Sequence, residues 1–255
     1  MCGRIAITLP PEAIRAFFAY AEQPNFPPRY NIAPTQPVPV VRMERVAGTS
    51  NRQRHFVLMR WGFLPGFVKD PKDFPLVINA RSETVQEKPS FRSALKRRRC
   101  IFIADAFYEW RRQEKGKSEP FLFRRRDGAP LALAGLWETW EGPNGEAVDT
   151  ACVVTTHANG LMAAVHDRMP VILERDDFDT WLDCDTHDVD DASPLMRPCE
   201  DDVLEMWPIS TAVNKVSNDG PDIQTRYDAK ADDHAPPPPP KARAKKPAAQ
   251  GDLFG

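Results

Sequence analysis

The sequence predicts an α+β fold: one domain built on a curved, mainly antiparallel β-sheet, barrel-like in shape, with a few short helices. Short apolar stretches with strand periodicity recur up to residue 227, separated by turn signals such as Asp127-Gly128 and Asn144-Gly145. Helical spacing of apolar residues is confined to brief stretches. From residue 228 to 255 the chain has no periodicity and includes five consecutive prolines, which predicts a disordered tail rich in proline and lysine.

The elements are expected in a defined order along residues 1–227. Apolar alternation and turn signals predict strands over residues 4–8, 38–43, 56–61, 100–111, 121–125, 131–136 and 151–156. Amphipathic spacing predicts helices over residues 12–22, 91–96, 159–165 and 176–182. Prolines exclude a regular helix from residues 29–36, for which we expect an ordered loop.

Composition limits the class of protein. The chain has 255 residues, of which 42% are hydrophobic and 27% charged, as in ordinary globular proteins. No apolar run is long enough to span a membrane, and no signal-peptide pattern precedes the first strand, so we expect a cytoplasmic protein. We also expect a monomer. The five cysteines are odd in number and form no C-x-x-C pair. We therefore expect neither disulfides nor structural zinc, and no metal or cofactor.

The charge is unevenly divided. Residues 176–202 hold eleven acidic side chains and one arginine, a local charge of −10, whereas the whole chain carries −2. The remainder therefore carries +8 and includes the basic runs at residues 96–99 and 124–126. This distribution allows a phosphate-binding face, although such runs are more often solvated surface.

Cys2 is the first candidate for chemistry. Removal of Met1 would leave a cysteine with both an α-amine and a thiol, whose reference pKa values are about 7.7–8.0 and about 8.5. Two nucleophiles on adjacent carbons suit attack on a carbonyl carbon. From these residues alone, an ordinary chain start is the favoured interpretation.

Three further positions have chemistry and a simpler structural alternative. Glu109, between aromatic residues at the end of an apolar strand, could act as a general acid or base, or could form an edge-strand salt bridge. His166 is followed by an acid and an arginine and could transfer protons, or could be a loop histidine with satisfied bonds. Asn79 and Arg81 would share one face of an extended segment, where an amide can orient a nucleophile and a guanidinium can bind phosphate.

Taken in order, the motifs resemble the SOS response-associated peptidase (SRAP) family over about residues 2–225. The resemblance is carried by Met1-Cys2-Gly3-Arg4, Arg29-Tyr30-Asn31-x-Ala33-Pro34, Trp61-Gly62-x-x-Pro65-Gly66, Ile78-Asn79-Ala80-Arg81-x-Glu83-Thr84, Phe107-Tyr108-Glu109-Trp110, His166-Asp167-Arg168-Met169-Pro170 and Trp207-Pro208-Ile209-Ser210 with Val213-Asn214 and Asn218. It implies a sensor and shield of abasic sites in single-stranded DNA, with a possible lyase-type activity and autoproteolytic removal of Met1.

The resemblance also implies roles for single residues. Cys2 would form a thiazolidine with the ring-opened deoxyribose, Asn79 would hold Cys2 and the sugar in register, Glu109 would shuttle protons, and His166 would promote ring opening. The resemblance implies that Arg4, Arg81 and Arg168 bind DNA phosphates and that the Thr155 hydroxyl also contacts the DNA. Phe67 and Trp110 are the aromatic residues implied to contact the bases. Family members often carry a tryptophan pair where this chain has Phe67-Val68, so stacking there is expected to be weaker. For Trp110, a place in the core is the competing interpretation.

The end of the chain suggests a second partner. Gln250-x-x-Leu253-Phe254 resembles the short peptides with which bacterial repair proteins bind the DNA polymerase sliding clamp. A flexible tether ahead of such a peptide would hold the domain near DNA. This similarity favours a bacterial nucleoid location at damaged replication forks, while an inert tail is the alternative.

Two other function classes stay open. Class II glutamine amidotransferases also begin Met-Cys-Gly, so Cys2 could be the N-terminal nucleophile of a hydrolase, either a peptidase or an amidotransferase-like enzyme. The chain lacks a glycine-rich segment of the kind that amidotransferases use to bind glutamine. A non-catalytic single-strand DNA-binding module, in which Cys2 is dispensable, is the third class.

Overall fold

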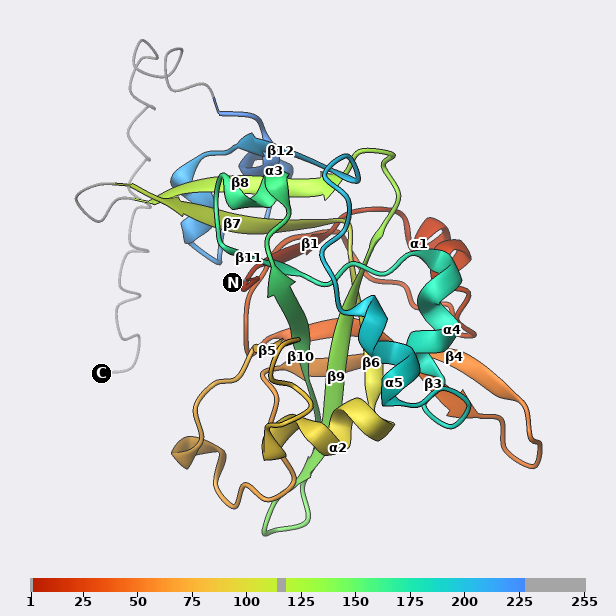
Figure 1. Ribbon diagram of the computed structural model, residues 1–255. Helices are drawn as coiled ribbons and strands as arrows, with labels where there is room; N and C mark the ends of the chain where they lie inside the picture. Colours follow the sequence, from red (N-terminus) through yellow and green to blue (C-terminus); the bar gives the residue numbers. More distant parts are fainter. Residues whose placement is uncertain (1, 114–117, 228–255) are drawn as a thin grey trace, which may run out of the picture.

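The structure is a computed structural model that describes residues 2–113 and 118–227. It consists of a closed β-barrel, a second β-sheet packed beside it, and short helices on the outside (Figure 1). Its strands are β1 (Ile5–Ile7), β2 (Arg29–Ile32), β3 (Pro37–Arg45), β4 (Arg52–Trp61), β5 (Asn79–Arg81), β6 (Arg99–Ala104), β7 (Ala106–Arg112), β8 (Ser118–Arg125), β9 (Leu131–Glu141), β10 (Ala147–His157), β11 (Arg168–Pro170) and β12 (Leu204–Pro208). Its α-helices are α1 (Pro11–Phe18), α2 (Pro89–Arg97), α3 (Gly160–Ala163), α4 (Phe178–Leu182) and α5 (Val189–Ala192).

The barrel is closed by the pairing of β9 with β10. Its strands follow the order β10-β4-β3-β6-β9, and β5 and β11 extend it by pairing with β10. Every pairing is antiparallel except those of β10 with β4 and β5, which are parallel. The prediction of a curved, mainly antiparallel and barrel-like sheet is therefore confirmed, and each named element lies within residues 5–208.

The second sheet has the order β12-β8-β7-β1-β2 and is antiparallel throughout. Because side chains alternate across a strand, its two faces differ. Phe107 and Phe123 stack on the inner face, within the core shared with the barrel. Tyr108 and Leu122 lie on the outer face, where Ile209 and its neighbours form a smaller apolar cluster.

The predicted strand over residues 100–111 is wrong as a single element. The chain leaves the barrel after β6, turns at Asp105 and enters the other sheet as β7. The Asp105 carboxylate accepts hydrogen bonds from the backbone N–H groups of Thr8 and Leu9 and from the Thr8 hydroxyl, which fixes this corner. Both halves are buried and apolar, so hydrophobicity alone did not show the break.

Two other boundaries also differ from the prediction. The first helix ends at Phe18 and not near residue 22, because Ala19 takes a left-handed conformation with φ of 54°. Residues 29–36 begin with the strand β2, so only their second half is a loop. The predicted turns are confirmed: Gly128 and Gly145 have φ of 74° and 85°, values that glycine adopts without a steric penalty.

The acidic residues 176–202 have a structural role in the described part of the chain. Asp179 binds Arg54 at 2.8 Å, and Asp183 binds Arg52 at 3.0 Å, so the carboxylates neutralise arginines of the β3–β4 hairpin. Arg99, 1% exposed, donates to the carbonyls of Trp181 and His187 at 2.5 and 2.7 Å. The acidic segment is thereby fixed against the barrel.

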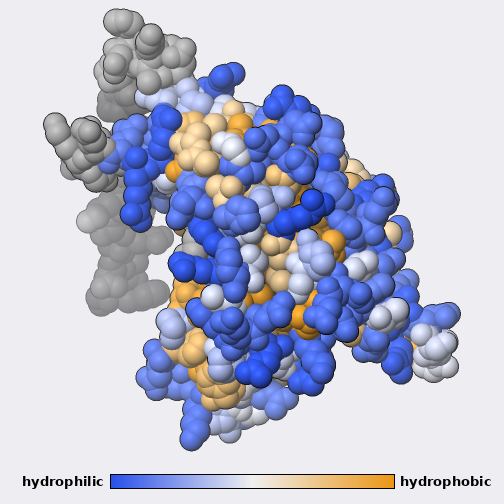
Figure 2. Space-filling view, viewed as in Figure 1, coloured by the Kyte–Doolittle hydropathy of each residue, from blue (hydrophilic) through white to orange (hydrophobic). Residues whose placement is uncertain are grey.

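The surface in the view of Figure 1 is mostly hydrophilic, with apolar side chains gathered in a central band and at the lower left (Figure 2). Among the described residues, the large apolar side chains that are most exposed are Phe67, Leu58 and Leu76. No helix in residues 2–113 or 118–227 has the length and apolar character needed to cross a membrane.

Candidate functional site

Cys2 lies in the short segment that leads into β1 and is fully buried. The Tyr108 N–H donates to the Arg4 carbonyl at 3.0 Å, as β1 and β7 pair. Continuing this antiparallel register by one residue places Gly3 opposite Glu109. The start of the chain therefore runs beside the buried end of β7.

Glu109 is the acidic neighbour of Cys2. Its side chain is on the inner face of β7, with the residue only 2% exposed. Burial raises the pKa of the Cys2 thiol well above its usual value, and the negative charge of Glu109 raises that pKa further. The thiol is therefore protonated at neutral pH and a weak nucleophile by itself, in contrast to a thiol activated as a thiolate.

Asn79 approaches Cys2 from the barrel side. It begins β5, which lies parallel to β10 with Asn79 opposite Val153. Its Nδ2 donates to the Cys2 carbonyl oxygen at 3.0 Å. Its Oδ1 is buried and accepts no hydrogen bond from the residues that the structure describes. One side of the amide thus fixes the backbone of Cys2, and the other presents an unused acceptor beside it.

Arg168 is bound to Glu83 by two parallel hydrogen bonds. Nη1 and Nη2 donate to the two carboxylate oxygens at 2.7 and 2.9 Å, and Nη2 also donates to the Thr155 carbonyl at 2.7 Å. The pair lowers the pKa of Glu83, mainly through this hydrogen bonding. Thr155 is fully buried, and its hydroxyl lies 3.3 Å from Arg168 Nη2. The ion pair joins the segment that follows β5 to the start of β11.

His166 stands in the turn between α3 and β11. The backbone N–H of Arg168 donates to His166 Nδ1 at 3.0 Å, and Asp167 Oδ1 is 2.9 Å from the same nitrogen. The histidine is therefore tied to the Arg168 end of the same β5–β10–β11 group.

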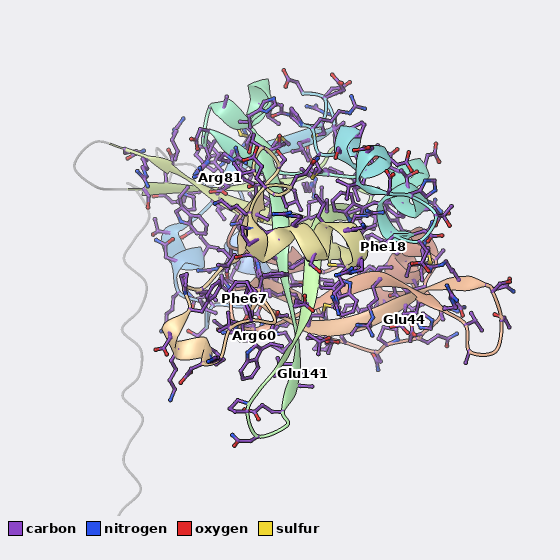
Figure 3. The ribbon with its side chains drawn as sticks, turned by 60° about the horizontal axis from the view of Figure 1, so that its bottom comes forward. Phe18, Glu44, Arg60, Phe67, Arg81 and Glu141 are labelled. Carbon is purple, nitrogen blue, oxygen red and sulfur yellow. The ribbon has the colours of Figure 1, made fainter. Side chains whose placement is uncertain are left out.

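The remaining predicted DNA contacts lie on several elements. Arg81, at the end of β5, is exposed, and Phe67, on the loop after β4, is 64% exposed (Figure 3). Trp110 lies on the outer face of β7, opposite to Glu109, and is partly exposed. Arg4 stands beside it, 5.7 Å from the ring centre. Contacts within the protein bring Cys2, Asn79 and Glu109 together, while Phe67 and Trp110 lie outside this buried group.

Glu83 was missed as a functional candidate. It stands within the quoted motif over residues 78–84, but its partner Arg168 is 85 positions away in the chain. An acid close to a candidate phosphate-binding arginine could have suggested an ion pair, and nothing local indicates which arginine is the partner.

Two further features bear on the site. Within residues 2–113 and 118–227, no group of three or more histidine, cysteine, aspartate or glutamate side chains is arranged to hold a metal ion. The predicted clamp-binding residues Gln250, Leu253 and Phe254 lie outside the described residues.

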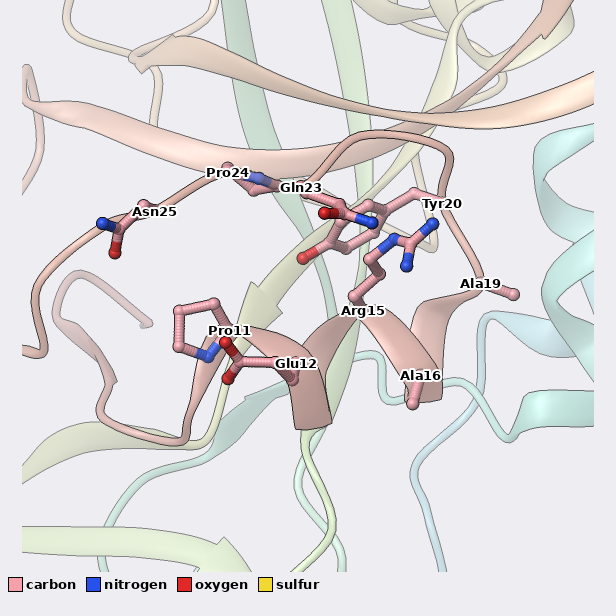
Figure 4. Close-up of a pocket in the computed structure, with 9 residues that line it drawn as sticks. All are labelled: Pro11, Glu12, Arg15, Ala16, Ala19, Tyr20, Gln23, Pro24 and Asn25. Carbon is pink, nitrogen blue, oxygen red and sulfur yellow. The ribbon is translucent and has the colours of Figure 1, made fainter.

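A pocket of about 690 Å³ lies elsewhere, between α1 and residues 20–25 (Figure 4). Glu12, Arg15, Tyr20 and Gln23 line it, and burial raises the pKa of Tyr20 to about 12. It includes none of the residues predicted to act in catalysis or DNA binding. Volume alone therefore does not locate the candidate site, which is the buried group around Cys2.

Comparison with known proteins identifies the family. The family model described as SOS response associated peptidase (SRAP) matches residues 1–216. The chain belongs to the SRAP family.

SRAP relatives resemble it over most of its length. It is 36% identical over 226 residues to the abasic site processing protein YoqW of Bacillus subtilis, covering 88% of this chain and 98% of that protein. It is 32% identical over 262 residues to the abasic site processing protein HMCES of Xenopus tropicalis, covering 87% of this chain and 77% of that protein.

Solved structures share the fold. A Bacteroides thetaiotaomicron protein has a TM-score of 0.75 at 22% identity, covering 89% of this chain and all of that one. A Bordetella bronchiseptica protein has a TM-score of 0.69 at 28% identity, covering 82% of this chain and all of that one.

Proposed function

We propose that this protein processes abasic sites in single-stranded DNA by forming a covalent thiazolidine link through Cys2. The observation that carries the proposal is the buried juxtaposition of Cys2 with the Glu109 carboxylate and the Asn79 amide. The names of the relatives, which describe abasic site processing, support the same substrate class.

The first step uses the α-amine that loss of Met1 would expose. The amine nitrogen of Cys2 adds to the aldehyde carbon C1′ of the ring-opened deoxyribose, and the oxygen leaves as water to give an imine. Glu109, next to Cys2, takes a proton from the nitrogen as the amine adds to the carbon, and returns a proton to the departing oxygen. Asn79 holds the Cys2 backbone, and its unused Oδ1 can accept a hydrogen bond from the amine or a sugar hydroxyl.

The second step uses the thiol. The sulfur adds to the imine carbon, the imine nitrogen gains a proton, and the five-membered ring closes. One water is lost overall, and no atom is oxidised or reduced. Because burial and Glu109 keep the thiol protonated, the amine attacks first and the thiol serves as the trapping group. An imine hydrolyses readily, so the ring makes the product durable.

The DNA strand is proposed to lie over the β5–β10–β11 group. Arg81 is exposed there, His166 is fixed by Arg168, and Phe67 offers an exposed aromatic ring on the loop after β4. Phosphate contacts position a strand without reading its sequence, which suits a lesion that lacks a base. His166 is proposed to assist opening of the sugar ring.

The test is a crosslinking gel. The protein is incubated with a single-stranded oligonucleotide that contains one abasic site, boiled in detergent and run beside an oligonucleotide with a tetrahydrofuran analogue, which has no aldehyde. We expect a heat-stable adduct with the abasic strand only. Absence of that adduct, or an equal adduct with the analogue, would contradict the proposal.

Two finer activities belong to this proposal. Autoproteolytic removal of Met1 agrees with the family description as a peptidase. If Cys2 performs this removal, N-terminal sequencing of the Cys2→Ala variant should find Met1 still present.

Docking of the tail on a sliding clamp is tested by changing Leu253 and Phe254 to Ala. Binding to the clamp should be lost, and unchanged binding would contradict the docking proposal.

A further inference from the structure

Arg4 is a partly buried cation held by neutral partners. Its Nη1 donates to Asn31 Oδ1 at 2.5 Å and to the Val213 carbonyl at 2.8 Å. Its guanidinium lies over the Trp110 ring. Within the described ranges 2–113 and 118–227, no carboxylate forms a salt bridge with Arg4. Its positive charge is therefore not neutralised by the protein.

Arg168 differs from Arg4 in how its positive charge is neutralised. Arg168 has a carboxylate partner, Glu83, which occupies its guanidinium fork. Burial lowers the pKa of Arg4, but an arginine in a protein stays protonated. A desolvated, unneutralised guanidinium is stabilised by an anion, and a DNA phosphate is the anion that the proposed substrate supplies.

Asn31 is the anchor of this arrangement. It is fully buried in β2, and its Nδ2 donates to the carbonyls of Asn218 and Val213 at 2.8 and 3.1 Å. Its backbone N–H donates to Asp219 Oδ1 at 2.9 Å. One asparagine thus binds both Arg4 and the segment of residues 210–219.

Asn214 connects that segment to the aromatic partner of Arg4. Its Oδ1 accepts a hydrogen bond from Trp110 Nε1 at 2.7 Å. The indole is therefore fixed in plane while its face lies against the Arg4 guanidinium, an arrangement that favours a cation. Asn214 itself is exposed, so a change there removes the bond without disturbing the core.

We propose that Asn31 and Asn214 are positioning residues that, through the segment of residues 210–219 and Trp110, orient Arg4 to bind a DNA phosphate. This inference rests on the proposed function, since it assigns the anion as the backbone of the DNA strand. Neither asparagine touches the reacting atoms. Each acts through Arg4, so its effect should be on DNA affinity and not on the chemical step.

The experiment measures non-covalent binding of an undamaged single-stranded oligonucleotide as a function of salt concentration. Loss of one phosphate contact reduces the slope of log K against log salt by about 0.7 for a single strand. We expect Arg4→Gln to show this reduction. Asn214→Ala should show part of the same reduction, with binding weakened about three- to tenfold for one lost hydrogen bond. Asn51→Ala, at an exposed turn between β3 and β4, is the matched control and should bind as the wild type does.

The double variant Arg4→Gln/Asn214→Ala separates positioning from a general structural effect. It should bind no more weakly than Arg4→Gln alone, because Asn214 acts through Arg4. Additive losses, an unchanged salt slope in Asn214→Ala, or no measurable binding by the wild type would each overturn the inference. Asn31→Ser should weaken binding to the same limit as Arg4→Gln. The unfolding midpoint of this variant is measured in parallel.

The crosslinking assay distinguishes failure of this inference from failure of the proposed function. If variants follow the pattern above but the wild type never crosslinks abasic DNA, the covalent chemistry is wrong and the positioning role stands. If crosslinking occurs and Asn214→Ala binds as tightly as the wild type, only the positioning role is wrong. At saturating abasic DNA, Asn214→Ala should crosslink at the wild-type rate.

Discussion

Two regions of this protein hold fully buried cysteines, and they differ in what surrounds the thiol. Cys100 and Cys152 lie in the barrel wall, on β6 and β10, within the apolar core. Cys2 lies before β1, beside the Glu109 carboxylate and within hydrogen-bonding distance of Asn79 through its carbonyl. Burial raises the pKa of all three thiols, so burial alone does not distinguish them.

The reactivity that we propose for Cys2 would therefore come from its polar neighbours and its backbone position. A buried, protonated thiol without such neighbours is inert. In the proposed reaction, the α-amine of Cys2 is a second nucleophile that starts the reaction, and the Glu109 carboxylate moves the protons.

Cys2→Ala should abolish the heat-stable adduct with abasic DNA, because it removes the sulfur that closes the ring. Cys152→Ala should retain the adduct in full, with a loss of stability of about 1–2 kcal/mol from the missing core contacts. The crosslinking gel and a denaturant titration measure the two effects. Loss of the adduct in Cys152→Ala at a temperature where it is folded would contradict the contrast.

Glu109→Gln should slow adduct formation by about 10²- to 10⁴-fold, the range for removing a general acid or base. The amide keeps the shape of the side chain but cannot carry protons. Single-turnover crosslinking at saturating DNA gives the rate. Glu141→Gln, at the exposed end of β9, is the control and should react at the wild-type rate (Figure 3). A rate in Glu109→Gln close to the control would exclude Glu109 from the chemistry.

Asn79→Ala should slow the reaction by about tenfold, since one hydrogen bond to the Cys2 backbone contributes on the order of 1 kcal/mol. The loss should appear in the rate at saturating DNA, in contrast to that of Asn214→Ala, which concerns affinity. Asn51→Ala again serves as the control. An unchanged rate with weaker binding would make Asn79 a DNA contact and not an orienting group.

The pH dependence of stability tests the buried thiols themselves. The folded-state pKa of Cys152 is raised above its unfolded value of about 9, so its contribution is complete below pH 9 and is lost as the pH rises further. Above pH 9, the wild type should lose about 1.4 kcal/mol per pH unit more than Cys152→Ala does. Urea unfolding at pH 8, 9, 10 and 11 measures the slopes. Parallel slopes would contradict burial of this thiol.

The fold was predictable where the local pattern is regular. The alternation in residues 121–125 and 151–156, and the glycines at Gly128 and Gly145, predicted β8, β10 and the hairpin turns correctly. The division of residues 100–111 was not predictable, because a buried apolar run has the same appearance in one strand as in two. Its cause is the bonding of Asp105 to Thr8 and Leu9, almost one hundred positions away.

The site was predictable in composition more than in geometry. The sequence motifs named Cys2, Asn79 and Glu109, and the structure brings these three together. Asn79 and Cys2 are 77 positions apart, so their hydrogen bond depends on how β5 pairs with β10. The pairing of Arg168 with Glu83 and the anchoring of Arg4 by Asn31 likewise depend on long-range contacts that no local pattern contains.

The most direct test of the central claim is the chemical structure of the product. Intact mass spectrometry of the adduct between the wild type and an abasic oligonucleotide should give the sum of the two, with Met1 absent, less one water. The adduct should persist without borohydride reduction, and peptide mapping should place the DNA on both nitrogen and sulfur of Cys2. An adduct that survives only after reduction, or that maps to another residue, would contradict the thiazolidine account.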